Sequence, residues 1–170
     1  RREVQRLLAR LGYSVDDAAL SRTIDFYAAR TSHGSTLSRV VHAWLLARAD
    51  PEASWSLFLE ALTSDLRDIQ GGTTREGVHI GVMAGTVDLV RRGYLGLELV
   101  GGCVSLDPRL PSQLPTLAFS LLVRDRWLDV AVRDGRVTVT SRAGNGGDVT
   151  VDLRGSRVVL DPGGSVEALL

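Results

Sequence analysis

Hydrophobic residues recur at helical spacing through the first 94 positions of the chain. In residues 16–30, Leu20, Ile24 and Tyr27 follow one another at intervals of four and three, which places them on one face of an α-helix. Caps, glycines and prolines divide the region into five predicted helices, at residues 2–11, 16–30, 35–49, 51–66 and 79–94. Asp16 is the predicted cap of the second helix, and Asp50-Pro51 opens the fourth.

The third predicted helix carries a pronounced apolar face. His42 lies among its apolar residues, and we interpret it as a core histidine with a hydrogen-bond partner rather than a ligand. The residues expected to point inward are Leu37, Val40, Val41, Trp44 and Leu45.

The hydrophobic period changes after residue 95. The stretch TLAFSLLVRDRWLDVAV (116–132) predicts two short strands around Arg124-Asp125-Arg126, and Asp134-Gly135 predicts a hairpin turn into a third strand. Short strands at close spacing predict a small antiparallel β-sandwich over residues 95–170, after a helical domain at 1–94. The boundary falls in residues 95–116, where LDPRLPSQLP holds three of the five prolines.

Composition narrows the classes of function. A hydrophobic fraction of 44% and a net charge of +0 favour a globular protein over a general nucleic-acid binder or a membrane-surface protein. All twenty basic residues are arginine, so no lysine can form a Schiff base or bind phosphate. Cys103 is the only cysteine, and the three histidines lack metal-ligand spacing, so we predict no metal and no other cofactor. The single cysteine and the lack of a visible signal peptide or membrane span predict a cytoplasmic protein.

Two glycine-containing loops precede predicted helices, SHGS at 32–35 and GGTTREGVH at 71–79. Helices joined by short loops run antiparallel, so we expect both loops at the same end of the helices. Helix N-termini expose unpaired N–H groups and partial positive charge, and glycine allows close backbone approach, so the loops could bind an anion. The alternative is that these residues only cap helices, since Thr73 and Glu76 have capping-box spacing.

Longer stretches resemble one known family. RTSHGSTLS (30–38), VVHAW (40–44), DIQGGTTREGVHIGVMAGTVDLVRRGY (68–94) and LDPRLP (106–111) are similar to the C-terminal part of glycoside hydrolase family 65. That family contains inverting phosphorylases of α-glucosyl disaccharides and some hydrolases. The resemblance implies that residues 1–94 are the last helices of an (α/α)6 catalytic barrel, and that residues 95–170 are the C-terminal β-sandwich.

The resemblance also implies a binding site. In the phosphorylases, inorganic phosphate is the co-substrate, held by the loop that resembles SHGS and by the histidine of the EG-x-H motif. It attacks the anomeric carbon opposite a general acid and yields β-glucose 1-phosphate. The phosphate-binding residues implied for this chain are His33, Gly34, Ser35, Thr36, Thr74 and His79.

The resemblance places the general acid, and a Lys-Gln pair that binds sugar, upstream of residue 1. We therefore expect this chain to be a C-terminal fragment, inactive alone, that works with the N-terminal part of the barrel. Its expected partners are an α-linked glucose disaccharide and phosphate, with no nucleic acid or membrane, and family phosphorylases are often homodimers.

Two other functions stay open from the sequence. Glu76 is the one carboxylate noted near the loops, and it could serve as the base of a hydrolytic member, a trehalase or an α-glucosidase. A non-catalytic segment that binds sugar or stabilises a larger assembly is the second alternative.

Overall fold

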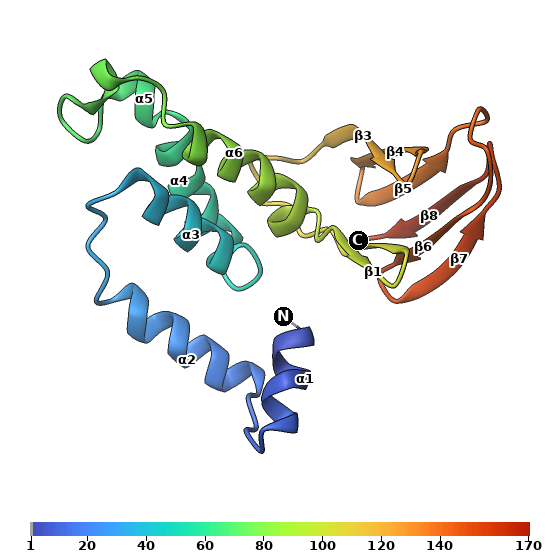
Figure 1. Ribbon diagram of the computed structural model, residues 1–170, viewed down its shortest axis with the longest axis horizontal. Coiled ribbons are helices and arrows are strands. Elements are labelled where there is room, and N and C mark those ends of the chain that lie inside the picture. Colours follow the sequence, from blue (N-terminus) through green and yellow to red (C-terminus); the bar gives the residue numbers. More distant parts are fainter. Residues whose placement is uncertain (1) are drawn as a thin grey trace. The chain divides into compact units, whose positions relative to one another are not determined.

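The computed structural model describes residues 2–170, and the chain divides into two compact units, residues 1–34 and residues 35–170. In the first unit, α1 (Arg2–Arg10) ends just before Gly12, whose φ of +84° favours glycine. Helix α2 (Asp17–Ala28) follows in the chain (Figure 1). It begins after Asp16, whose Oδ1 accepts a hydrogen bond from the Ala19 N–H at 2.6 Å. The predicted cap at Asp16 is therefore confirmed.

Helical segments form the first part of the second unit. They are α3 (Thr36–Leu46), α4 (Pro51–Leu62), α5 (Ser64–Arg67), the 3₁₀ turn η1 (Thr73–Glu76), α6 (Ile80–Asp88) and the π-helical turn η2 (Leu89–Tyr94). The helix predicted over residues 51–66 is interrupted at Thr63, whose hydroxyl donates to the Leu59 carbonyl at 2.7 Å. In the described part of the chain, no helix is long and apolar enough to cross a bilayer.

The buried face of α3 differs from the prediction. Val40 and Ala43 are buried on the side that packs against α4 and α6, and a Cβ at Gly85 of α6 would lie 2.7 Å from Val40 Cγ1. His42 and Leu45 are only half-buried. The prediction of an inward orientation is wrong for three residues, which occupy a neighbouring side of the helix and are exposed: Leu37, Val41 and Trp44.

Two four-stranded sheets form the rest of the second unit, with strand orders β1-β2-β6-β7 and β3-β4-β5-β8. The strands are β1 (Glu98–Val100), β2 (Cys103–Leu106), β3 (Leu117–Val123), β4 (Arg126–Arg133), β5 (Arg136–Ser141), β6 (Val149–Leu153), β7 (Ser156–Leu160) and β8 (Ser165–Leu169). The β2–β6 pair is parallel and the other pairs are antiparallel, so the sheets are mostly, not wholly, antiparallel. No hairpin sets the direction of β2 against β6, because strands of the other sheet separate them in sequence.

The turns of the second sheet follow the sequence prediction. Arg124-Asp125 joins β3 to β4 and Asp134-Gly135 joins β4 to β5, and all four residues have φ between 49° and 69°. Positive φ at both positions is the geometry of the type I′ hairpin turn. The alternate residues Leu128, Val130 and Val132 of β4 enter a hydrophobic core to which both sheets contribute.

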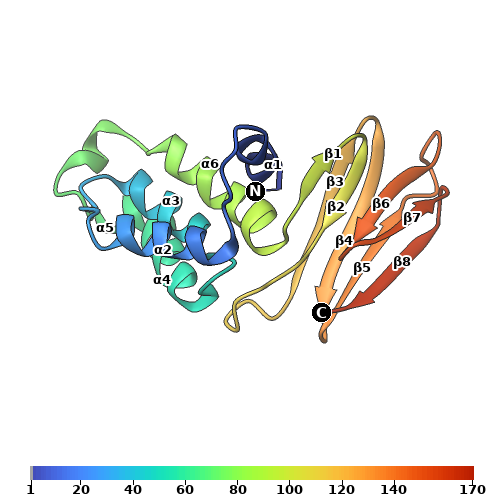
Figure 2. The same cartoon turned by 90° about the horizontal axis from the view of Figure 1, so that it is seen from below.

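The helices and sheets of the second unit meet at a hydrogen-bonded junction. Tyr94, at the end of η2, is fully buried. Arg48 Nη1 donates to the carbonyl of Asp107 at 2.7 Å and to its carboxylate at 3.0 Å. Glu52 Oε1 accepts hydrogen bonds from the N–H of Ser112 at 3.1 Å and from its hydroxyl at 2.8 Å. These contacts join the sheets to the end of the helices opposite the starts of α3 and α6 (Figure 2).

Candidate functional site

The starts of α3 and α6 lie at the end of the helices that points away from the sheets (Figure 1). Ser35 caps α3, and its Oγ accepts a hydrogen bond from the Leu37 N–H at 3.3 Å. His79 directly precedes α6. The structure therefore brings two helix N-termini to the same end of the helices, and the partial positive charge of such termini favours an anion.

The other predicted phosphate ligands differ in their surroundings. Thr36 is only 2% exposed, so its hydroxyl is shielded from solvent. Thr74 lies in η1, within the glycine-rich loop. His33 and Gly34 belong to the first unit, so the geometry of the second unit does not include them.

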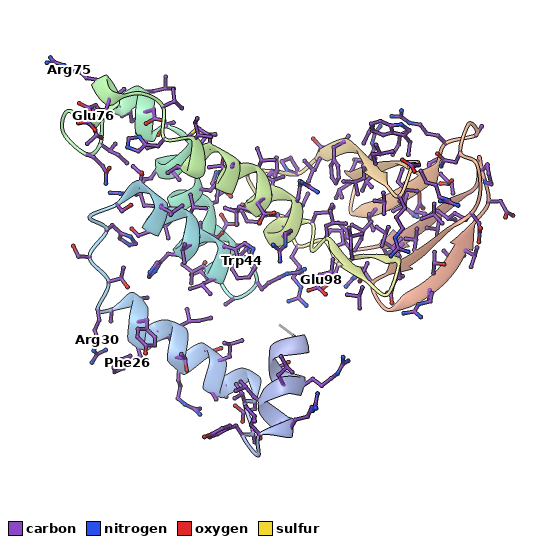
Figure 3. All side chains as sticks on the ribbon, viewed as in Figure 1. Phe26, Arg30, Trp44, Arg75, Glu76 and Glu98 are labelled. Carbon is purple, nitrogen blue, oxygen red and sulfur yellow. The ribbon has the colours of Figure 1, made fainter. Side chains whose placement is uncertain are left out.

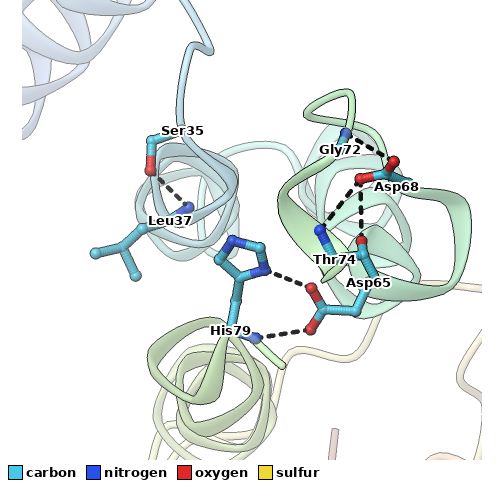
Figure 4. A network of polar contacts seen from close by, with 7 residues as sticks. All are labelled: Ser35, Leu37, Asp65, Asp68, Gly72, Thr74 and His79. Carbon is cyan, nitrogen blue, oxygen red and sulfur yellow. Dashed lines mark hydrogen bonds and ion pairs between the residues drawn. The ribbon is translucent and has the colours of Figure 1, made fainter. Parts of the chain in front are cut away.

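His79 is held by a carboxylate that the sequence did not single out. Asp65, in the short helix α5, accepts two hydrogen bonds from His79: Oδ2 from the backbone N–H at 3.0 Å, and Oδ1 from ring atom Nδ1 (Figure 4). The side chain of Asp65 is 12% exposed and that of His79 is 29% exposed. The two bonds fix both the start of α6 and the orientation of the ring.

The contact with Asp65 distinguishes the two ring nitrogens of His79. The hydrogen bonds from His79, chiefly that from its ring, lower the pKa of Asp65, so this carboxylate is ionised at neutral pH and can only accept. The shared proton is therefore assigned to Nδ1 of His79. In Figure 4 the other ring nitrogen, Nε2, lies on the side of the ring that faces the start of α3.

The glycine-rich loop closes around a second carboxylate. Asp68 Oδ2 accepts a hydrogen bond from the Gly72 N–H at 2.7 Å, and its Oδ1 accepts from the N–H and the hydroxyl of Thr74 at 3.3 and 3.1 Å (Figure 4). Gly71 and Gly72 have φ of +70° and +109°. These bonds, that from the Thr74 N–H above all, lower the pKa of Asp68. The glycines thus let the backbone wrap a negative charge, and that charge belongs to the chain itself.

The helix-cap interpretation of these loops holds only in part. Ser35 does cap α3, but no side-chain hydrogen bond caps η1, so the capping box expected from Thr73 and Glu76 is not formed. Glu76 is exposed beside Arg75 at the outer tip of the loop between α5 and α6 (Figure 3). Asp65 and Asp68 are therefore the carboxylates that contact the loop residues, rather than Glu76.

Sequence reasoning missed Asp65 and Asp68 for different reasons. Asp68 has a local signal, an Asp just before the Gly71-Gly72 pair, which is a common way to hold a turn. Asp65 has none, because it lies 14 residues before His79 and meets it only through the fold.

Family models match most of the chain. The model of the glycosyl hydrolase family 65 central catalytic domain matches residues 3–88, and that of the glycosyl hydrolase family 65 C-terminal domain matches residues 97–160. The chain belongs to glycosyl hydrolase family 65. The resemblance found in the glycine-rich motifs is thereby confirmed.

Relatives in this family include phosphorylases. An uncharacterized glycosyl hydrolase of Mycobacterium tuberculosis is 42% identical over 165 residues, which is 97% of this chain and 12% of that protein. The trehalose 6-phosphate phosphorylase of Lactococcus lactis is 36% identical over 141 residues, covering 82% of this chain and 18% of that enzyme. Other relatives are named as phosphorylases of kojibiose, trehalose and maltose. The chain thus spans less than a quarter of the length of these relatives.

The fold is shared with a solved protein from the human microbiome, provisionally named a kojibiose phosphorylase. It superposes with a TM-score of 0.77 at 20% identity, over 92% of this chain and 21% of that protein. At this level of identity, the match concerns the fold.

Proposed function

We propose that this segment forms the phosphate-binding end of an inverting disaccharide phosphorylase, as the last helices of an (α/α)6 barrel followed by a β-sandwich. The observation that carries the proposal is the pair of helix starts, α3 and α6, at one end of the helices with the His79 ring held in place beside them. Membership of a family whose named relatives are phosphorylases supports it.

In this proposal, phosphate is bound by hydrogen-bonding groups at the starts of α3 and α6. Ser35 contributes its hydroxyl, the start of α3 contributes N–H groups that include that of Thr36, and His79 contributes ring atom Nε2. Thr74 joins them only if its hydroxyl exchanges its bond to Asp68 for one to phosphate. His33 and Gly34 stay predictions from the family resemblance.

The reaction needs one further group from outside these residues. A phosphate oxygen attacks the anomeric carbon of an α-linked glucose unit, and the glycosidic C–O bond breaks on the opposite face. A general acid protonates the departing sugar oxygen, and the product is β-glucose 1-phosphate. Phosphate takes the place of a protein base, so no carboxylate of the loops has to activate a nucleophile, and no other cofactor is required.

A hydrolase of the same family is the competing proposal. It would require a carboxylate that activates water. Asp65 and Asp68 both accept hydrogen bonds and have lowered pKa values, which makes them weak bases. Glu76 is exposed at the tip of the loop, away from the Asp65–His79 pair. These features favour phosphate as the nucleophile.

The test uses the full-length enzyme that carries this segment. It is incubated with trehalose, trehalose 6-phosphate, maltose, kojibiose and nigerose, each with and without inorganic phosphate, and both glucose and β-glucose 1-phosphate are assayed. If β-glucose 1-phosphate forms only when phosphate is added, the proposal is supported, and the disaccharide that gives this product is the substrate. Release of glucose at the same rate with and without phosphate overturns it in favour of hydrolysis.

Two variants separate the candidate groups. His79→Ala is expected to raise the KM for phosphate by about 10-fold to 100-fold, the effect of losing one hydrogen bond to a charged group. Glu76→Gln serves as the matched control and should leave turnover within about twofold. Loss of activity in Glu76→Gln with unchanged phosphate kinetics in His79→Ala would instead support the hydrolase.

A further inference from the structure

We propose that Asp65 is a positioning residue for phosphate: its carboxylate fixes the His79 ring so that Nε2, and not Nδ1, faces the anion. This inference rests on the proposed function and adds a residue that neither the glycine-rich motifs nor the family resemblance assigns. Asp65 itself does not touch phosphate. It acts through the imidazole of His79.

The geometry gives Asp65 two separate holds on His79. A bond to Nδ1 sets the rotation of the ring, because a histidine ring otherwise has two broad orientations in which each nitrogen changes places with a carbon. The bond at 3.0 Å to the backbone N–H sets the position of the residue at the start of α6. A residue whose side chain and backbone are both bound to one carboxylate has little freedom to turn.

The same contact arranges the charges. The carboxylate of Asp65 lies on the Nδ1 side of the ring, and Nε2 lies on the side that faces the start of α3 (Figure 4). When the ring carries a second proton, both nitrogens donate, one to Asp65 and the other to a phosphate oxygen. The ring thus stands between the two negative groups and binds both, which is the arrangement used to orient histidines at other sites.

Asp65 lies just after the interruption of the helix predicted over residues 51–66. The break at Thr63 starts the short helix α5, and Asp65 lies in its first turn. Asp68 follows α5 and holds the loop through Gly72 and Thr74. The two carboxylates therefore have separate tasks: Asp68 shapes the loop, and Asp65 orients the histidine.

The experiment measures phosphate binding directly. The dissociation constant of inorganic phosphate for the full-length enzyme is determined by calorimetry without disaccharide, and the KM values for phosphate and for disaccharide are determined separately. The variants are Asp65→Ala, Asp65→Asn, His79→Ala and the double variant of Asp65→Ala with His79→Ala. Asp88→Asn is the matched control, because Asp88 pairs with Arg92 at 3.5 Å at the far end of α6.

We expect Asp65→Ala to weaken phosphate binding by about 10-fold or more and to leave the KM for disaccharide within about twofold. Asp65→Asn keeps an acceptor oxygen without the charge, so we expect a smaller loss of about threefold to tenfold. In the His79→Ala background, Asp65→Ala should add nothing, because two residues that act as one unit are not additive. Asp88→Asn should bind phosphate normally.

Three outcomes would overturn the inference. They are unchanged phosphate affinity in Asp65→Ala, a full additional loss in the double variant, or equal changes in the two KM values. If Asp65→Ala does not fold, Asp65→Asn decides alone, and unchanged phosphate affinity in that folded variant rejects the inference. A wild-type enzyme that neither binds nor uses phosphate rejects the proposed function and this inference together. If the wild-type enzyme uses phosphate and the Asp65→Ala variant binds phosphate with unchanged affinity, only the inference is rejected.

Discussion

The helices and the sheets of the second unit bury their apolar residues in different ways. The two sheets share one core, in which Leu128, Val137 and Val151 are completely buried. The helices form smaller clusters that depend on alanines, and they leave large side chains exposed, such as Leu66 at 87% and Ile80 at 77%. The contrast lies in the cores, since apolar residues on the outer strand faces, such as Leu122 and Val159, are exposed as well.

The difference has a geometric reason. A strand alternates between two faces, so one apolar face per sheet closes a core when two sheets meet. A helix with apolar residues on more than one side needs a neighbour on each side. The candidate site lies on the helical part, beside exposed apolar residues such as Leu37 and Ile80, whereas the sheets hold a closed core. This placement is common, because ligand-binding loops usually lie in the less stable parts of a protein.

The largest expected effect tests this contrast directly. Leu128→Ala in β4 should lower the free energy of unfolding by about 2–5 kcal/mol, because it leaves a cavity in the shared core. Leu66→Ala removes the same atoms from an exposed position and should cost less than about 0.5 kcal/mol. Urea unfolding followed by circular dichroism measures both, and equal losses would show that the contrast is wrong.

A second prediction concerns the junction between helices and sheets. Gly96 has φ of +67°, and a Cβ there would lie 2.0 Å from Arg48 Nη2 and 2.6 Å from the Asp107 carbonyl oxygen. Gly96→Ala should therefore displace Arg48 from Asp107 and cost about 2 kcal/mol or more. Gly101→Ala is the matched control, since Gly101 has φ of +59° with no atom within 4 Å of its Cβ position. A thermal melt in which both variants lose the same amount would show that backbone strain alone acts at Gly96.

The smallest expected effect concerns pH and the outer face of the second sheet. Arg142 donates to Asp129 through Nε at 2.8 Å and Nη2 at 2.7 Å, and these bonds, with one from Ser120, lower the pKa of Asp129 to about 2. A carboxyl whose folded pKa is depressed stabilises the fold above its unfolded pKa and loses that contribution as pH falls through its folded pKa.

The difference in the free energy of unfolding between wild type and Asp129→Asn should accordingly be largest above about pH 4. It should shrink as the pH falls toward about 2. Arg142→Gln removes the donor instead of the acceptor and should show the same narrowing. Urea midpoints measured across this pH range test the prediction. A constant difference between wild type and both variants would mean that the pair does not control the pKa of Asp129.

Much of the fold could be predicted from the sequence, because its signals are local. The caps at Asp16 and Asp50 and the hairpin turn at Asp134-Gly135 depend on residues within a few positions of one another. Most helices and strands follow from hydrophobic periodicity. Two exceptions are the break at Thr63 and the change from α6 to the π-helical turn η2 within the helix predicted over residues 79–94. Family membership also followed from contiguous motifs, above all the stretch from Asp68 to Tyr94.

The candidate site could be predicted only in part. The sequence indicated His79, Ser35 and a glycine-rich loop at helix starts, and their proposed roles await the phosphate experiments. It did not indicate that Asp68 accepts hydrogen bonds from backbone N–H groups of the loop, or that Asp65 binds the ring of His79. It also did not indicate the parallel pairing of β2 with β6.

The sequence by itself thus determined which regions form helices, strands and hairpin turns, because the hydrogen bonds and the alternating polarity that specify them involve neighbouring residues. Only the tertiary structure decided which side of α3 is buried and which carboxylate meets His79. Both depend on how separate helices pack, because Asp65 in α5 meets a residue that lies 14 positions away in the sequence.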